Sequence, residues 1–291
     1  MGRRRKQLVL LAAFAVLLVV LAGCGSGGGG TSTTGPTVLP ARTFGLSAFK
    51  PTGPVVAGKR TTVSFTIRQP SGKPLTEYKE CCEPHEGVDL IIVRSDDSHI
   101  QYDDADADPD GTVSEPVVFP TPGRYRITID AYPKVAGPTT PFNFQLFKWV
   151  TVKGKYRPRP LPRYRSTQVV DGYRFTIEGR PHLKAIEPTF LVIRVTDPAG
   201  HKAHFTNWRG ALAHAIFFHQ GSLAYSHTHI CKPGDTYCFS ALGTVRVTGH
   251  STAPGILKAG VLLPESGTWR MFLLTYLGGH VLTVPFTLHA K

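Results

Sequence analysis

Short runs of β-branched and aromatic residues alternate with turns rich in Pro, Gly and Asp from residue 44 to the C-terminus. Such runs predict β-strands, and no segment after the N-terminal leader shows the 3.6-residue apolar period of a long amphipathic helix. The 30 glycines and 24 prolines follow no collagen-like period, which is typical of a turn-rich protein. The clearest predicted strands are 63–67, 88–93, 124–130 and 142–147. The pattern therefore predicts an all-β protein.

The second half of the chain repeats the first. Pro-Thr-Pro-Gly-Arg-Tyr-Arg-Ile at 120–127 matches Pro-Glu-Ser-Gly-Thr-Trp-Arg-Met at 264–271, and the Pro-Phe pair at 141–142 recurs at the same offset of 144 residues. A repeat of this length is a whole domain rather than a unit of a solenoid. We expect two tandem β-sandwiches, the first at 43–152 and the second at 169–291.

The first 23 residues have the pattern of a secretory signal. Four basic residues at 3–6 precede an apolar run at 8–20, which is too short to span a membrane comfortably. The sequence Leu-Ala-Gly-Cys at 21–24 resembles a bacterial lipobox. This resemblance implies that Cys24 is acylated and anchors the mature chain at the outer face of the cell membrane. The alternative is an uncleaved N-terminal anchor, and the basic cluster suits either Sec or twin-arginine export. Each reading places the folded part outside the cytoplasm.

Two segments of low complexity separate these parts. Residues 24–42 contain a Gly/Ser/Thr-rich stretch with no apolar side chain to bury, which predicts a flexible tether. Residues 153–168 combine Pro with Arg and predict an extended polyproline linker.

The formal net charge of +13 becomes +9 without the four basic residues of the leader. The basic linker is either a soluble spacer or a contact for an anionic envelope polymer or lipid head groups. Its few aromatic residues offer no platform for nucleic acid.

Histidine is concentrated in the second predicted sandwich, since 10 of the 12 histidines follow the linker. A hairpin that turns at 220–222 would place His227 and His229 on one face of its return strand, with Cα atoms about 7 Å apart. Two imidazoles at that spacing can bind one metal ion, with His214 on the outgoing strand as a third ligand and His280 as a weaker fourth. Because the mature chain has a single methionine, we expect imidazole binding of Cu(II) or Zn(II).

The first sandwich is expected to carry a reduced version of this hairpin. If Val88 is aligned with His214, and the turn of the first hairpin is given one extra residue, Tyr102 and Asp104 align with His227 and His229. His85 and His99 lie near this hairpin but not at the matching positions. The comparison predicts a metal site that the second copy has kept and the first copy has largely lost.

These residues resemble a known family, the small secreted β-sandwich modules that are labelled YtkA-like and occur in tandem in actinobacterial lipoproteins. The matching features are the block from His214 to His227-x-His229, the Pro-x-x-Gly-x-Tyr/Trp-Arg turn and the closing Pro-Phe-Thr at 285–287. The resemblance implies immunoglobulin-like domains and a link to the handling of copper or other metals in the envelope. The chain departs from the family at 230–231, where it has Ile-Cys and a proline is common.

Four cysteines remain besides the acylated one, and an even number in an exported protein favours disulfides. Cys231 and Cys238 bracket a short loop, and we expect them to form a structural disulfide. Cys81 and Cys82 are adjacent, and a bond between adjacent cysteines is strained. They are either partners in disulfides between the domains or a thiol pair that would bind a soft metal together with His85.

Asp106, Asp108 and Asp110 resemble the first ligands of an EF-hand loop, with a glycine at the sixth position. Position twelve is Val117 instead of a bidentate Glu, and no flanking helices are predicted. Weak calcium binding is one interpretation of this segment, and a solvated acidic turn between strands is the other.

The chain has no Gly-x-Ser-x-Gly, P-loop, dinucleotide or His-Glu-x-x-His motif. The leading prediction is therefore a lipid-anchored extracytoplasmic protein without enzymatic activity, which binds a transition metal in its second domain. One alternative is a structural or adhesive envelope module that binds no metal and contacts a polymer or a protein. The other is a metal-dependent enzyme, because three ligands with an open coordination position are also a catalytic arrangement.

Overall fold

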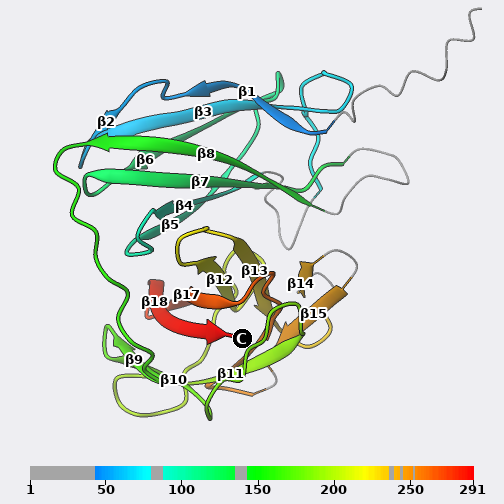
Figure 1. The fold of residues 1–291 in the computed structure, drawn as a ribbon. Helices are drawn as coiled ribbons and strands as arrows, with labels where there is room; N and C mark the ends of the chain where they lie inside the picture. The colour runs from blue at the N-terminus through cyan, green and yellow to red at the C-terminus, as the bar shows by residue number, and fades with distance from the viewer. Residues whose placement is uncertain (1–42, 80–87, 135–142, 236–238, 243–244, 252) are drawn as a thin grey trace, which may run out of the picture. The chain divides into compact units, whose positions relative to one another are not determined.

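The computed structural model describes residues 43–79, 88–134, 143–235, 239–242, 245–251 and 253–291. Within them the chain forms strands and turns without a helix, so the protein is all-β (Figure 1). Accordingly, no helix in this part is long and apolar enough to cross a membrane. The predicted signal, Cys24 and the tether up to residue 42 lie outside the described residues. Residues 42–291 form a single compact unit.

The strands of the first half form two sheets, with the orders β1-β3-β6 and β2-β8-β7-β4-β5 (Figure 1). All neighbours pair antiparallel except β2 with β8. A sheet of β1, β3 and β6 that faces a sheet built on β8, β7 and β4 corresponds to the A-B-E and G-F-C sheets of an immunoglobulin-like sandwich. The strands are β1 (Gly45–Lys50), β2 (Val55–Val56), β3 (Arg60–Arg68), β4 (Val88–Arg94), β5 (Ile100–Ala105), β6 (Thr112–Val118), β7 (Gly123–Ala131) and β8 (Phe144–Lys153).

The second half repeats this plan with an additional hairpin. Its sheets have the orders β16-β11-β10-β9 and β14-β15-β13-β12-β17-β18. The hairpin β14–β15 extends the larger sheet, where β15 runs parallel to β13. The strands are β9 (Thr167–Val170), β10 (Tyr173–Ile177), β11 (Thr189–Thr196), β12 (Ala213–His219), β13 (Tyr225–Cys231), β14 (Phe239–Leu242), β15 (Val245–His250), β16 (Ile256–Val261), β17 (Gly267–Leu277) and β18 (His280–Ala290).

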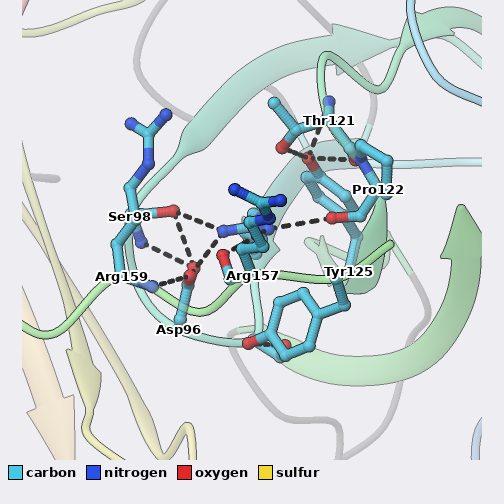
Figure 2. Close-up of polar contacts among 10 residues, drawn as sticks. Asp96, Ser98, Thr121, Pro122, Tyr125, Arg157 and Arg159 are labelled. Atoms are coloured by element: carbon cyan, nitrogen blue, oxygen red, sulfur yellow. Dashed lines mark hydrogen bonds and ion pairs between the residues drawn. The ribbon is translucent and has the colours of Figure 1, made fainter. Parts of the chain in front are cut away.

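The repeated Pro/Gly turn encodes the same corner in both sandwiches. In the first, the buried Tyr125 hydroxyl donates to the carbonyl oxygen of Thr121 at 3.0 Å and lies 3.3 Å from the backbone nitrogen of the same residue (Figure 2). In the second, Nε1 of Trp269 donates to the carbonyl oxygen of Glu265 at 3.1 Å. An aromatic side chain that binds the backbone a few residues upstream is the tyrosine corner of immunoglobulin-like domains. Here Trp replaces Tyr in the second copy.

The start of the linker is attached to the first sandwich. The Arg94 guanidinium donates to the carbonyl oxygens of Pro122 at 2.8 Å and Arg157 at 3.3 Å (Figure 2). The Asp96 carboxylate accepts the backbone N–H of Arg159 at 2.8 Å. These bonds fix the position of the linker where it leaves the β8 edge, so at this end it is not a free spacer.

Besides the core inside each sandwich, a third apolar cluster contains residues of both. Ile91 and Val93 of β4 meet Ile216 and Phe218 of β12 there, and these two pairs are each separated by 125 residues in the chain. Equivalent outer faces of the two repeats therefore pack against each other. The buried members of the cluster are Ile91, Val93, Ile100, Tyr102, Ile216, Phe218, Leu223, Phe272 and Leu274.

Charged groups are buried beside this cluster. Arg126 and Arg270 are equivalent in the two repeats, and each is 8% exposed. Arg126 donates to the carbonyl oxygen of Leu223 in the other sandwich. Burial and the neighbouring Asp96 raise the pKa of Asp97 to about 8, against the attraction of the two arginines. The contact between the sandwiches thus combines apolar packing with buried polar groups from both repeats.

The substitution Tyr125→Phe keeps the aromatic ring but removes the hydroxyl of the corner. We expect it to lower the free energy of unfolding by about 1–2 kcal/mol, because partly buried backbone groups lose their partner. Urea denaturation of the full chain measures this change. Tyr164→Phe, at an exposed position in the linker, is the control and should leave stability unchanged. Equal stabilities of all three proteins would contradict the structural role of the hydroxyl.

Candidate metal centre

The hairpin of β12 and β13 carries three histidines close together. His214 on β12 is directly opposite His229 on β13, and His227 is opposite Ile216. Directly opposed residues of an antiparallel pair have Cβ atoms about 4.5–5.5 Å apart, and diagonal neighbours remain within reach of long side chains. The register therefore places all three imidazoles next to one another.

The alternation along β13 decides which way these side chains point. Ser226 donates to the carbonyl oxygen of Leu262, just after β16, at 3.1 Å, and Thr228 donates to that of Gly260 in β16 at 2.7 Å. Ile230 packs in the core of the second sandwich. His227 and His229 alternate with these residues and so lie on the outer face of the sheet, the face that contacts the first sandwich.

The spacing of the ring nitrogens suits a metal ion. Nδ1 of His214 and Nε2 of His227 are 3.2 Å apart. One nitrogen of each of the three rings, including His229, lies within 4.8 Å of the other two. Two nitrogens bound tetrahedrally to one ion, each at 2.0–2.1 Å, would be about 3.3 Å apart. The first two histidines already have this separation.

A hydrogen bond to the backbone sets the tautomer of His214. Its Nε2 lies 3.1 Å from the carbonyl oxygen of Trp208, which can only accept, so Nε2 carries the hydrogen. The lone pair of the neutral ring is then on Nδ1, the atom that faces His227. A metal-binding histidine typically donates its other N–H to a carbonyl or a carboxylate in this way.

Burial keeps the imidazoles of His214 and His227 neutral. It lowers the pKa of His214 and His227 well below the ordinary value, and the neighbouring His229 lowers both further. A neutral imidazole is the form that binds a metal ion, so at neutral pH protons compete weakly for these nitrogens.

Aromatic side chains enclose the site. Tyr102 of the first sandwich lies edge-on to His214 and His227, with ring centroids 5.2 and 5.8 Å apart. Trp208 lies edge-on to His214 at 5.2 Å. The guanidinium of Arg209 covers the rings of Tyr102 and Trp208 at 4.8 and 4.9 Å. These side chains line the site beside His214, which is fully buried, and His227, which is half-buried.

Two carboxylates of the first sandwich also reach this site. Asp89 on β4, Asp130 on β7 and His227 form a second group whose ligand atoms all lie within 4.8 Å of one another. Neither aspartate was predicted as a site residue. Each stands in an otherwise apolar strand segment, where a charged residue is rare unless it has a partner, and this is the signal that could have found them.

The other predicted histidines lie elsewhere. His280 is at the start of β18 with Nε2 2.8 Å from the carboxylate of Asp171, and this hydrogen bond raises the pKa of His280. His99 packs edge-on to Tyr125, with ring centroids 6.3 Å apart. Neither belongs to a potential metal-binding group of the described residues. His85 lies outside the described part of the chain.

The predicted alignment of the two hairpins was wrong by one residue. Asp89 pairs with Asp104 in the first hairpin as His214 pairs with His229 in the second. Both strands of the first hairpin therefore match those of the second at an offset of 125 residues, and the turn of the first hairpin has no extra residue. Asp89, not Val88, therefore occupies the first ligand position, while Val88 faces the core. A shift of one residue moves a side chain to the opposite face of a strand, which is why the alignment matters.

The matches of Tyr102 with His227 and of Asp104 with His229 agree with the prediction. The first sandwich thus presents Asp, Tyr and Asp where the second presents three histidines. Asp104 forms an ion pair with Arg209 of the second sandwich. The first copy carries different chemistry at these positions rather than a weaker form of the same site.

The acidic segment forms a turn between β5 and β6. Asp106, Asp108 and Asp110 are exposed, and Asp110 accepts the backbone N–H of Thr112 at 2.8 Å. In the part of the chain that the structure describes, these carboxylates do not form a potential metal-binding group. The solvated turn, rather than the calcium loop, fits this geometry.

The cysteine predictions remain open. Cys231 is fully buried, with Sγ 3.8 Å from the carbonyl oxygen of Gly210. Its predicted partner Cys238, and the pair Cys81 and Cys82, lie outside the described residues. The disulfide stays a prediction.

A separate cavity of about 440 Å³ is bordered by the end of the linker and the C-terminal strand. Leu183 and Leu288 supply its apolar wall, and its lining has no acidic residue. Its polar lining consists of Tyr164, Arg180, His182, Lys184, His289 and Lys291. The cavity is therefore a cationic recess that suits an anionic group.

Residues 167–291 match the model of a family described as Domain of unknown function (DUF8832). The match begins at the first residue of β9 and so covers the second sandwich, including the histidine hairpin. No curated protein sequence matches the chain. The resemblance to YtkA-like modules thus stays a prediction.

Several solved structures are similar to the chain at low identity. A Salmonella α2-macroglobulin reacted with methylamine is 10% identical, with a TM-score of 0.25 over 86% of this chain and 15% of that one. A tetra-tandem repeat from the extending region of a large adhesion protein is 9% identical, with a TM-score of 0.25 over 86% and 48%. Invasin, a bacterial integrin-binding protein, is 14% identical, with a TM-score of 0.21 over 84% and 39%.

The chain thus corresponds to 15% and 48% of the length of the first two structures. Similarity at this level carries no information about function. The assignment of the immunoglobulin-like fold depends instead on the strand orders and the two aromatic corners described above.

An NMR titration of the histidine rings in the full chain tests the electrostatics of the site. His280 should titrate above its ordinary pKa of 6.5, because its protonated form binds Asp171. His214 and His227 should stay neutral to well below pH 6.5, because burial penalises the charged ring. Titration of His214 and His227 near pH 6.5 would show that the cluster is open to water.

Proposed function

We propose that the protein is an extracytoplasmic, lipid-anchored binding module that holds one transition-metal ion, Cu(II) or Zn(II), in its second sandwich. The ligands are His214, His227 and His229. The anchor is acylated Cys24 at the outer face of the cell membrane, which follows from the lipobox pattern.

The observation that carries the proposal is the 3.2 Å separation of Nδ1 of His214 and Nε2 of His227, with a nitrogen of His229 within 4.8 Å of both. The bond from His214 to the Trp208 carbonyl supports it, because it directs the lone pair into the cluster. Three imidazoles suit zinc and Cu(II) better than the hard ions calcium and magnesium, which prefer oxygen ligands.

Titration calorimetry of the full chain with Zn²⁺ and Cu²⁺ tests this function. We expect one ion per chain, and we expect His227→Ala/His229→Ala to weaken binding by at least about a hundredfold, which corresponds to about 2.7 kcal/mol. His280→Ala is the matched control, since this ring lies in the same sandwich but outside the cluster. An unchanged affinity in the double variant would rule out the metal site.

The second candidate function is that of an adhesive envelope module that binds an anionic polymer. The cationic cavity favours it, because Arg180, Lys291 and the linker residue Tyr164 border one recess without an acidic side chain. An anionic group there would be attracted by several positive charges at once, and salt would screen that attraction.

Arg180→Ala/Lys291→Ala should weaken this attraction. We expect the full-length variant to elute from a heparin column, used as a generic polyanion, at clearly lower salt than the wild type. Arg174→Ala removes an exposed charge of β10 that is not part of the cavity lining and is the control. Identical elution of the double variant and the wild type would exclude the cavity as the polyanion site.

A further inference from the structure

The carboxylates of Asp89 and Asp130 occupy an unusual position in the first sandwich. Asp89 on β4 lies directly opposite Asp130 on β7 in the antiparallel register. Like charges at opposed positions of a sheet destabilise the pairing, and burial strengthens their repulsion. Asp130 is 1% exposed and Asp89 is half-buried. A cation between the two carboxylates would remove this penalty.

Hydrogen bonds hold Asp130 in place. Its Oδ1 accepts from the side-chain amides of Asn143 and Gln145, both at 2.9 Å, and its Oδ2 accepts from the Tyr225 hydroxyl at 3.1 Å. Tyr225 belongs to β13, the strand that carries two of the three histidines. Carboxylates that bind metals are commonly oriented by such a second layer of donors.

The two groups of ligands share one residue. His227 lies within 4.8 Å of the carboxylate oxygens of Asp89 and Asp130, and also within 4.8 Å of the nitrogens of His214 and His229. The imidazole of His227 therefore belongs to both groups, and the carboxylates of Asp89 and Asp130 adjoin the three-histidine cluster at this ring.

We propose that a carboxylate of the Asp89–Asp130 pair completes the three-histidine centre, so that a single metal ion is coordinated by both sandwiches. This inference rests on the proposed function, and it adds the fourth ligand and a role for the metal. Three nitrogens and one carboxylate oxygen would fill all four positions of a tetrahedral zinc ion, so that no open position is left. Binding of the ion then stabilises the contact between the two halves of the chain, because the ion binds only when the halves are in place.

Zinc titration of full-length variants tests the fourth ligand. Asp89→Asn and Asp130→Asn preserve the size of the side chain and remove its charge. We expect each to weaken Zn²⁺ binding by at least about tenfold, while one ion per chain still binds. Asp103→Asn is the matched control: this residue is on β5, and its side chain accepts from Gln101 instead of reaching the histidines. X-ray absorption of the zinc-loaded wild type should show four nitrogen or oxygen ligands, three of them with the outer-shell scattering of imidazole.

Hydrogen exchange of the wild type tests the role of the metal and does not depend on whether the variants fold. Zinc should increase the protection of β4 and β7 as well as that of β12 and β13. Protection confined to β12 and β13, or wild-type affinity in both Asp variants, would overturn the inference and leave the three-histidine site intact. Two ions per chain would also overturn it. If the wild type binds no metal, the proposed function itself fails.

Discussion

The packing of two equivalent sheet faces against each other is the contact on which the rest of the structure depends. In an isolated sandwich the outer face of such a sheet is commonly solvated and polar. Here that face is apolar at Ile91 in the first repeat and at Ile216 and Phe218 in the second, and each face covers the other. Water is excluded as a result, so every polar side chain on these faces needs a partner within the protein. The histidines, the aspartates and the buried arginines at this contact are all subject to that requirement.

The repeat explains how one contact comes to hold complementary groups. Positions 125 residues apart have the same place in the two hairpins, yet one carries Asp89 and Asp104 where the other carries His214 and His229. When equivalent faces pack together, residues that differ between the copies are brought close to one another. Acidic oxygens of Asp89 and Asp130 from one half and the imidazole of His227 from the other then converge.

The two proposed binding functions use different parts of the molecule. The histidine centre is enclosed by aromatic rings and by the contact between the halves. The cationic cavity lies instead beside the linker and the C-terminal strand. The linker is attached to the first sandwich through Arg94 and Asp96, and one of its residues, Tyr164, lines the cavity. The linker is therefore attached to the first sandwich at one end and borders the cavity at the other.

The sequence by itself determined the all-β class, the duplication and the placement of His227 and His229 on one face of a strand. Strand formation and side-chain alternation are local properties that a two-residue period reveals. It also contained the Tyr125 and Trp269 corners as a repeated turn. Only the tertiary structure decided that His280 lies apart from the cluster, that Asp89 rather than Val88 matches His214, and that Asp130 approaches His227. The match of Asp89 depends on the register within each hairpin, and the places of His280 and Asp130 depend on contacts between segments more than 90 residues apart. No local pattern in the chain encodes either of these.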